Sequence, residues 1–169
     1  MERCEVLAIY RQAAGELSCF EITPKLMRGE ELTEAQAKYV VALDSLFISE
    51  PPLDEEILVY RGCSEESFQR LEAGDYPSFL STSRVEYEAR EFARTEGDGP
   101  LLHIKLPKGF KSLRVSTEAS LEKGELLLPR GLSFDVVEIC SPLSGELAQD
   151  IATILVPSSK EYACSIKID

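Results

Sequence analysis

The sequence predicts an α+β fold, in which N-terminal helices pack on a mainly antiparallel β core of two sheets. Three observations support this prediction: helical periodicity over the first third of the chain, a Pro51-Pro52 pair that ends it, and seven short β-type runs after Leu53. Helices that precede the strands, instead of alternating with them, are typical of the α+β class. At 169 residues the chain fits one domain, with a helical region over 1–52 and the β core over 53–169.

Four helices are expected from the spacing of apolar residues and from capping residues. Thr33, followed three residues later by Gln36, forms a capping-box signature at the start of the second helix. Ser64 can cap the third helix, and Ser83 with Glu86 offers another capping box at the start of the fourth. The expected helices cover residues 2–14, 33–47, 64–71 and 85–95.

The β core is expected from short runs that are rich in β-branched, aromatic and leucine residues. In the run LLHIKL, leucine and isoleucine alternate with His103 and Lys105, which places His103 on the outer face of its strand. We therefore expect this single histidine at a surface or a sheet edge and not in catalysis. The expected strands cover residues 57–60, 77–82, 101–106, 125–128, 133–139, 151–157 and 162–168.

Charge and hydropathy limit the classes of function. Thirty acidic against eighteen basic residues give a net charge of −12, which argues against broad adhesion to nucleic acid or anionic membranes, although not against a nucleic-acid substrate held in a local site. No apolar run approaches the roughly 20 residues that span a bilayer. The N-terminal MERCEVLAIYRQ does not resemble a secretory signal. We expect a cytoplasmic protein, in its own or a target cell, without a membrane partner.

The cysteines do not form a metal-binding or disulfide pattern. All five are widely spaced, without a C-x-x-C pair, and the chain has one histidine. A disulfide framework or a zinc site would need closer pairs or histidine partners. We therefore expect free, mostly buried thiols and no bound metal.

Three short segments carry the functional signal. The first is LVYRG at 58–62, the second is FLSTS at 79–83, and the third is EKGELLLPRG at 122–131. In this order and at this spacing they resemble the Arg / Ser-Thr-Ser / Glu signature of the mono-ADP-ribosyltransferases, specifically the bacterial toxin-like exoenzyme group. The resemblance extends from about Tyr10 to Val156 and implies that family's fold, with an NAD cleft within the β core.

The resemblance implies that NAD is the substrate and that Arg61, Ser81 and Glu125 form the catalytic set. Cleavage between nicotinamide and ribose passes through an oxocarbenium-like cation, as glycosidic cleavage does. A guanidinium such as that of Arg61 suits the pyrophosphate or ribose oxygens. In the family the first serine orients the glutamate, a role that falls on Ser81. Glu125 would accept the ribose 2′-hydroxyl and stabilise the cation.

Further NAD contacts are implied around these three residues. Gly62 would let the dinucleotide approach the backbone, while Phe92 and Arg94 would touch nicotinamide and phosphate. For Phe92 the alternative is a place on the buried face of its helix. Arg28 falls roughly where the family places an arginine before the first strand. The expected NAD-binding residues are thus Tyr60, Arg61, Gly62, Ser81, Thr82, Ser83, Phe92, Arg94 and Arg28.

The acceptor half of the expected site departs from the family pattern. Two residues before Glu125, where arginine-modifying members carry Glu, this chain has Lys123. At 4–6 Å its charge would repel a guanidinium by roughly 3–4 kcal/mol, which disfavours arginine as acceptor. Arginine becomes possible if Glu122 swings into place over a bulge at Gly124. The loop that follows Arg114 has no aromatic residue on which a base could stack, which favours a protein side chain as acceptor.

Two other functions stay open on the sequence alone. The acceptor can be an RNA or DNA base, with Arg114 as the nearest planar side chain. Alternatively the chain is an inactive relative that binds NAD or a partner, or an acidic interaction protein. As a toxin or effector, an active enzyme would need an inhibitor or antitoxin in its own cytosol.

Overall fold

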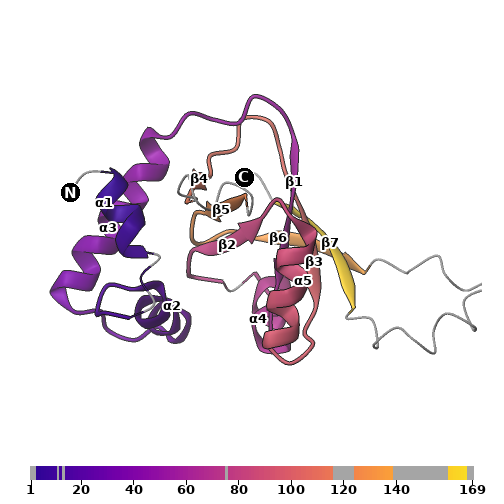
Figure 1. Ribbon diagram of the computed structural model, residues 1–169, viewed down its shortest axis with the longest axis horizontal. Coiled ribbons are helices and arrows are strands. Elements are labelled where there is room, and N and C mark those ends of the chain that lie inside the picture. The colour runs from indigo at the N-terminus through magenta and orange to yellow at the C-terminus, as the bar shows by residue number, and fades with distance from the viewer. Residues whose placement is uncertain are drawn as a thin grey trace, which may run out of the picture.

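The computed structural model describes residues 3–10, 12, 14–74, 76–115, 124–138 and 160–166 of the chain. Helices precede and then interrupt the strands, as the α+β prediction requires (Figure 1). The helices are α1 (Arg3–Tyr10), α2 (Cys19–Arg28), α3 (Glu34–Ser49), α4 (Glu65–Glu72) and α5 (Glu86–Thr95). The strands are β1 (Ile57–Gly62), β2 (Leu80–Ser83), β3 (Leu101–Leu106), β4 (Leu113–Arg114), β5 (Glu125–Leu128), β6 (Phe134–Glu138) and β7 (Glu161–Ile166).

Two of the expected helix starts are confirmed by their capping hydrogen bonds. At the start of α3 the Thr33 hydroxyl accepts the Gln36 N–H, and the Gln36 side chain accepts the Thr33 N–H. At the start of α4 the Ser64 hydroxyl accepts the Ser67 N–H. These bonds satisfy amide groups that a helix N-terminus would otherwise leave without partners.

Helix α2 was not among the helices expected from periodicity, because Pro24 lies inside it and normally ends a helix. It ends at Gly29, whose φ of 65° lies in the left-handed region and whose N–H is donated to the Leu26 carbonyl. Helix α1 ends at Tyr10, earlier than the expected 2–14 helix.

The start of α5 corrects a second expectation. Val85, and not Ser83, is the N-cap residue, and it provides no side-chain cap. Ser83 is the last residue of β2, so its extended backbone places it two residues before the helix cap. Its hydroxyl there accepts the Val85 N–H at 2.9 Å. The Ser83–Glu86 capping box is therefore wrong.

The strands form one hydrogen-bonded sheet with the order β4-β5-β2-β1-β3-β7-β6. Neighbours are antiparallel, except that β3 and β7 are parallel. A single residue pair, Tyr60–Ser83, joins β1 to β2, whereas β1 and β3 pair from Ile57–Leu106 to Gly62–Leu101. We call the Tyr60–Ser83 pair the seam. The expectation of two separate sheets is thus corrected: two strand groups exist, but backbone pairing at the seam makes them continuous.

Two hydrophobic clusters hold these layers together. Helices α1–α3 gather on one side of the β2-β5-β4 group (Figure 1), where Val6 and Leu43 pack with Leu113 and Leu127 of β4 and β5. The other cluster includes Val59 of β1, and α5 packs against this strand while α4 contacts β6. The sheet therefore separates one core beneath the N-terminal helices from a second core beneath α4.

The strand predictions hold best where the apolar run is short and well bounded. The runs 101–106 and 125–128 match β3 and β5. Strand β4, with two residues, was not expected, and the expected strand 151–157 lies outside the described residues. His103 is not at an edge, because β3 lies between β1 and β7. Its half-buried ring packs edge-on against Tyr60, 5.2 Å between centroids, and hydrogen-bonds Glu161 at 3.0 Å.

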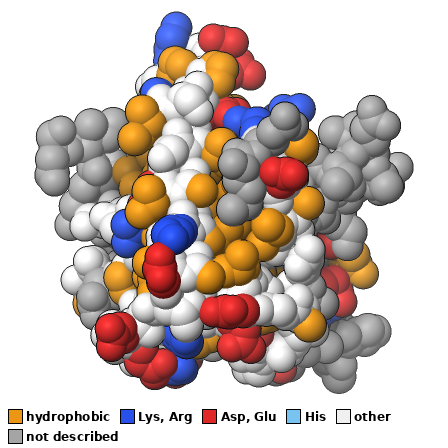
Figure 2. All heavy atoms as spheres, turned by 90° about the vertical axis from the view of Figure 1, so that its left-hand side faces the viewer, with side chains coloured by type: hydrophobic (Ala, Val, Ile, Leu, Met, Phe, Trp, Pro, Cys, Tyr) orange, Lys and Arg blue, Asp and Glu red, His pale blue; other side chains and the backbone are white. Residues whose placement is uncertain are grey.

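The surface carries the excess of acidic residues. Seen from the helical side, acidic side chains gather along the lower rim, and hydrophobic side chains are exposed above them in the middle of this face (Figure 2). Within the part of the chain that is described, no helix is long and apolar enough to cross a membrane. Cys63 and Cys164 are buried free thiols, whereas the free thiol of Cys19 is only partly buried.

Candidate active site

The ends of β1, β2 and the start of β5 lie side by side in the sheet. Ser83 of β2 is directly opposite Tyr60 of β1 on one side and Glu125 of β5 on the other. Directly opposed residues share a face of a sheet, and side chains alternate along each strand, so Ser81 lies on this face too. The sheet register thus brings all three sequence motifs to one place.

A cavity of about 550 Å³ lies over this place. This volume is within the ordinary range for a small-molecule site. Its walls come from the segment of α1 and α2, from β1 and β2, from α5, and from the start of β5. The lining residues are Tyr10, Cys19, Phe20, Thr23, Pro24, Tyr60, Arg61, Gly62, Tyr76, Phe79, Ser81, Thr82, Ser83, Glu88, Ala89, Phe92, Glu96 and Glu125. Arg61, Ser81 and Glu125, expected to act together, therefore border one cavity.

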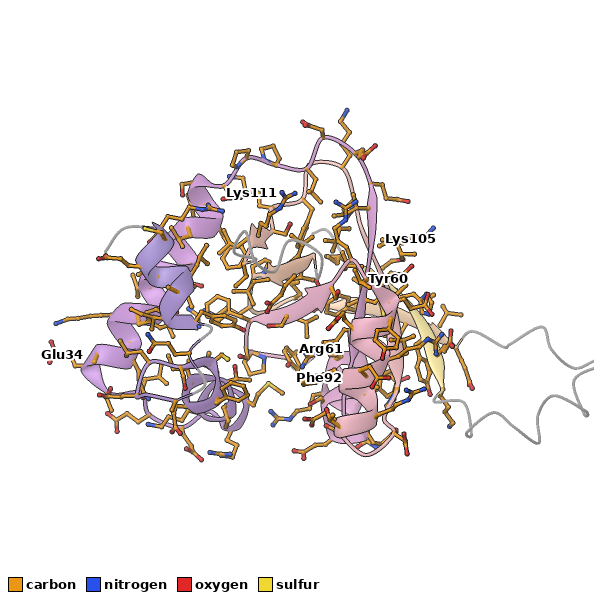
Figure 3. All side chains as sticks on the ribbon, viewed as in Figure 1. Glu34, Tyr60, Arg61, Phe92, Lys105 and Lys111 are labelled. Carbon is orange, nitrogen blue, oxygen red and sulfur yellow. The ribbon has the colours of Figure 1, made fainter. Side chains whose placement is uncertain are left out.

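Arg61 is held from two directions. Its terminal Nη1 donates a hydrogen bond to the Ser81 carbonyl at 3.1 Å. Its guanidinium carbon lies 4.7 Å from the centroid of the Phe92 ring, so that α5 supports the cation from one face (Figure 3). The Nε of Arg61 is buried and has no hydrogen-bond partner among the described residues. A buried donor without a partner is unfavourable, and an anionic or polar ligand oxygen would relieve it.

Phe92 belongs to the cavity wall and not to the core. Its side chain is 40% exposed, while Ala89 and Ala93 form the buried face of α5. Of the two alternatives left by the sequence, a place on the buried face of α5 is therefore wrong, and the ring borders the cavity.

Ser81 connects the cavity to the N-terminal helices. Its hydroxyl lies 3.1 Å from the Tyr10 hydroxyl, within hydrogen-bond distance. Thr82 also borders the cavity, but its buried hydroxyl donates to the Leu126 carbonyl at 2.8 Å. Thr82 therefore links β2 to β5. Of Ser81 and Thr82, it is Ser81 that contacts the cavity wall formed by the N-terminal helices.

Glu125 begins β5 immediately after Gly124, whose φ of 54° is left-handed. This conformation favours glycine, and a Cβ there would also meet the Arg84 side chain at 2.9 Å. Burial, and then the negative charge of Glu125, raise the pKa of the Cys19 thiol. Burial also raises the pKa of Tyr10, to which Glu125 adds a smaller contribution. The half-buried carboxylate is therefore close enough to α1 and α2 to act electrostatically on Tyr10 and Cys19.

Gly62 has a different structural role from the one expected. A Cβ at this position would lie 2.5 Å from the Ala93 nitrogen and closer still to the Ala89 carbonyl oxygen. Glycine is thus required because α5 packs directly against β1. Gly62 borders the cavity, but close packing of the helix is sufficient to explain it.

Three expected arginines do not line the cavity. Arg28 is exposed and pairs with Glu30 just after α2, and Arg94 is exposed and pairs with Glu91. Arg114 is exposed on the edge strand β4, opposite Leu126. The acceptor-recognition residues Glu122 and Lys123 lie outside the described residues.

The sequence does not predict that the N-terminal helices form one wall of the cavity. Tyr10 and Cys19 border the cavity, and so do Phe20, Thr23 and Pro24. Tyr10 is counted among the apolar residues of an amphipathic helix, and no sequence signal separates it from an ordinary core tyrosine. Among the described residues, no group of three or more His, Cys, Asp or Glu side chains could hold a metal ion.

Comparison with known proteins agrees with this geometry. A family model described as ADP-ribosyltransferase exoenzyme matches residues 24–156. The curated NAD(+)–arginine ADP-ribosyltransferase EFV of Enterococcus faecalis (strain ATCC 700802 / V583) is 30% identical over 121 residues. This match covers 66% of the present chain and 25% of that protein, so the chain spans about a quarter of the length of its curated relative.

Solved structures show the same fold. Plx2a, an ADP-ribosyltransferase toxin from Paenibacillus larvae, has a TM-score of 0.64 at 16% identity, over 98% of this chain and 85% of that one. Exoenzyme S from Pseudomonas aeruginosa, in complex with human 14-3-3 protein beta and bound to Carba-NAD, has a TM-score of 0.59 at 17% identity, over 86% of this chain and 66% of that one. At these identities the likeness concerns the fold.

Proposed function

Because the chain belongs to the ADP-ribosyltransferase exoenzyme family, we propose that it is an NAD-dependent mono-ADP-ribosyltransferase whose acceptor is a protein side chain. It breaks the bond between the nicotinamide nitrogen and the ribose anomeric carbon. Nicotinamide leaves with the bonding electrons, and an acceptor nucleophile attacks the anomeric carbon and loses its proton.

The observation that carries this proposal is the convergence of Arg61, Ser81 and Glu125 on one cavity of about 550 Å³. Ser81 and Glu125 are brought together by the register of β2 and β5, and Arg61 of β1 is joined to them by its hydrogen bond to the Ser81 carbonyl, so no contiguous motif supplies the three. A surface arginine or a solvated glutamate would have no reason to share a cavity with the other two.

Arg61 fits the binding of the dinucleotide. Arg61 borders the cavity, and a guanidinium donates in a planar fork to phosphate or ribose oxygens. The Phe92 ring and the Ser81 carbonyl fix the guanidinium before substrate arrives. Such preorganisation reduces the conformational entropy lost on binding.

Glu125 fits the chemical step. A carboxylate that accepts the ribose 2′-hydroxyl interacts more strongly as positive charge develops on the sugar, so its stabilisation is concentrated in the transition state. The partly buried setting strengthens this interaction relative to bulk water.

The acceptor is assigned by class only. The name of the Enterococcus faecalis relative favours arginine. Lys123, two residues before Glu125, favours an uncharged acceptor instead, because its charge would repel a guanidinium. We propose a protein side chain, with arginine as the first residue to test. A toxin or effector role in a cytosol, with an inhibitor partner in the producing cell, follows from the same proposal.

The test is nicotinamide release from labelled NAD, together with label transfer to a cell lysate and, separately, to RNA. The wild-type protein should release nicotinamide and label protein, and Glu125→Gln should slow both by roughly 10²- to 10³-fold. Glu138→Gln, an exposed glutamate of β6, is the matched control and should behave as wild type. Mass spectrometry of the labelled peptide then identifies the modified side chain.

Other outcomes distinguish the alternatives. NAD binding without nicotinamide release would replace the proposal by an inactive NAD-binding relative. If only RNA carries the label, the acceptor is a nucleobase and not a protein side chain. Absence of any NAD-induced thermal shift would leave only an interaction protein.

A further inference from the structure

One polar contact joins the N-terminal helices to the motif strands, and the proposed function does not use it. The hydroxyl of Tyr10, the last residue of α1, lies 3.1 Å from the hydroxyl of Ser81 on β2, 71 residues away in the chain. Both residues line the cavity, and the Tyr10 side chain is only 5% exposed. The bond therefore forms inside the protein and not at its solvent-exposed surface.

The direction of this hydrogen bond follows from the chemistry of the two hydroxyls. Burial raises the pKa of Tyr10, so the phenol keeps its proton throughout the neutral range. A phenol is more acidic than an alcohol and is the better donor, so Tyr10 donates and Ser81 accepts. A serine hydroxyl carries one hydrogen and two lone pairs, and accepting from Tyr10 leaves that hydrogen available for another acceptor.

Ser81 is then fixed at two of its atoms. Its carbonyl oxygen accepts from Arg61 at 3.1 Å, and its hydroxyl lies 3.1 Å from the Tyr10 hydroxyl, the donor assigned above from its acidity. Glu125 is its diagonal neighbour on the same face of the β2–β5 pair, since Ser83 lies directly opposite Glu125. Diagonal neighbours in an antiparallel pair are within reach of long side chains.

We propose that Tyr10 is a positioning residue for the transfer reaction, an inference that rests on the proposed function. By donating to the Ser81 hydroxyl, Tyr10 fixes the rotamer in which Ser81 directs its own hydrogen towards the Glu125 carboxylate. Helix α1 thereby sets the orientation of the catalytic carboxylate through Ser81.

The chain provides a matched control for this role. Tyr39 of α3 lies in the same helical layer, and its buried hydroxyl donates to the Val6 carbonyl at 2.7 Å. Tyr39 does not line the cavity. Tyr10→Phe and Tyr39→Phe therefore each remove one buried hydrogen bond from the same layer, but only the first removes a bond to Ser81.

The experiment measures kcat and KM for nicotinamide release in the wild type, Tyr10→Phe, Tyr39→Phe, Ser81→Ala and the double variant Tyr10→Phe/Ser81→Ala. We expect Tyr10→Phe to lower kcat on the order of three- to tenfold and to leave KM within about twofold. The reason is that the variant loses the hydrogen bond that, through Ser81, orients the Glu125 carboxylate. Tyr39→Phe should keep the wild-type kcat. In the Ser81→Ala background, Tyr10→Phe should add nothing.

A wild-type kcat in Tyr10→Phe would overturn the inference, and so would an undiminished effect in the Ser81→Ala background. Should Tyr10→Phe fail to fold, Ser81→Ala alone decides: a wild-type kcat there overturns the inference, and a loss of similar size with KM preserved supports it. An inactive wild-type protein would instead overturn the proposed function, and this inference with it.

Discussion

The guanidinium of Arg61 lies over the face of Phe92, 4.7 Å from guanidinium carbon to ring centroid, with β1 supplying one residue and α5 the other. The contact connects the strand and the helix through a cation and a ring at the cavity wall (Figure 3). Because Phe92 is partly exposed, its position depends on Arg61 as much as the position of Arg61 depends on it.

Replacing Arg61 by lysine should weaken NAD binding by about tenfold or more, since an ammonium is a point charge that can neither stack on Phe92 as a plane nor donate in a fork. The Kd for NAD, measured by calorimetry, checks this expectation. Arg130→Lys is the control, because Arg130 pairs with Asp44 away from the cavity. An unchanged Kd in Arg61→Lys would contradict the assignment of Arg61 to NAD binding.

Glu125→Gln should separate binding from turnover. Glutamine keeps the size of the side chain but loses the charge, so kcat should fall by roughly 10²- to 10³-fold while the affinity for NAD is nearly preserved. Steady-state kinetics together with a direct binding measurement distinguish the two effects. Equal losses in kcat and in affinity would show that Glu125 acts mainly in the ground state.

Gly62→Ala should destabilise the protein by about 3 kcal/mol, because the added Cβ collides with the backbone of α5 at Ala89 and Ala93. Gly29→Ala is the comparison: it has open space but a left-handed φ of 65°, and should cost about 1 kcal/mol. Denaturant unfolding of both variants measures the difference. Equal losses in the free energy of unfolding would mean that α5 can move away from β1 at little energetic cost.

Glu161→Gln should reduce stability at neutral pH but not in acid. Partial burial would raise the pKa of Glu161, but hydrogen bonds and charge from Arg90 and His103 outweigh it, so the pKa lies below its ordinary value of 4.5. A carboxylate with a lowered pKa contributes stability above its unfolded-state pKa and loses that contribution as pH falls through the folded-state pKa.

The expected difference in the free energy of unfolding between wild type and Glu161→Gln is about 1 kcal/mol at pH 7, and it should vanish as the pH falls below 4.5. Unfolding by urea across this range checks it. Glu138→Gln removes an exposed charge from the adjacent strand and should show no such dependence. A difference that is constant with pH would assign the effect to packing.

The segments with the clearest local signals are those that the sequence predicts best. The Thr33–Gln36 capping box and the run at 125–128 appear as expected, because both depend on residues a few positions apart. Arg61, Ser81 and Glu125 were expected from the family resemblance of three segments and not from local periodicity, and all three border the cavity. Local patterns failed at α2, where Pro24 is tolerated inside a helix, and at Ser83, where extended backbone displaces the cap.

The remaining part of the site depends on contacts between distant segments. Tyr10 meets Ser81 across 71 residues, and nothing in the amphipathic pattern of α1 distinguishes a tyrosine that faces the cavity from one in the core. Gly62 is a second example: a glycine beside a motif arginine suggests close approach of a ligand, and the sequence does not show that α5 also packs against it. The surroundings of a side chain depend on tertiary packing, and the local periodicity of the sequence carries no information about that packing.

The wall formed by α1 and the first part of α2 determines where this protein can be cut for expression. The family match begins at residue 24, so a fragment starting there would keep Arg61 and Glu125 yet lose Tyr10, Cys19 and Phe20. It would also remove Val6 and Ile22 from the cluster that covers β4 and β5. A fragment that starts at the family match would therefore lack one wall of the cavity and part of the core beneath the N-terminal helices.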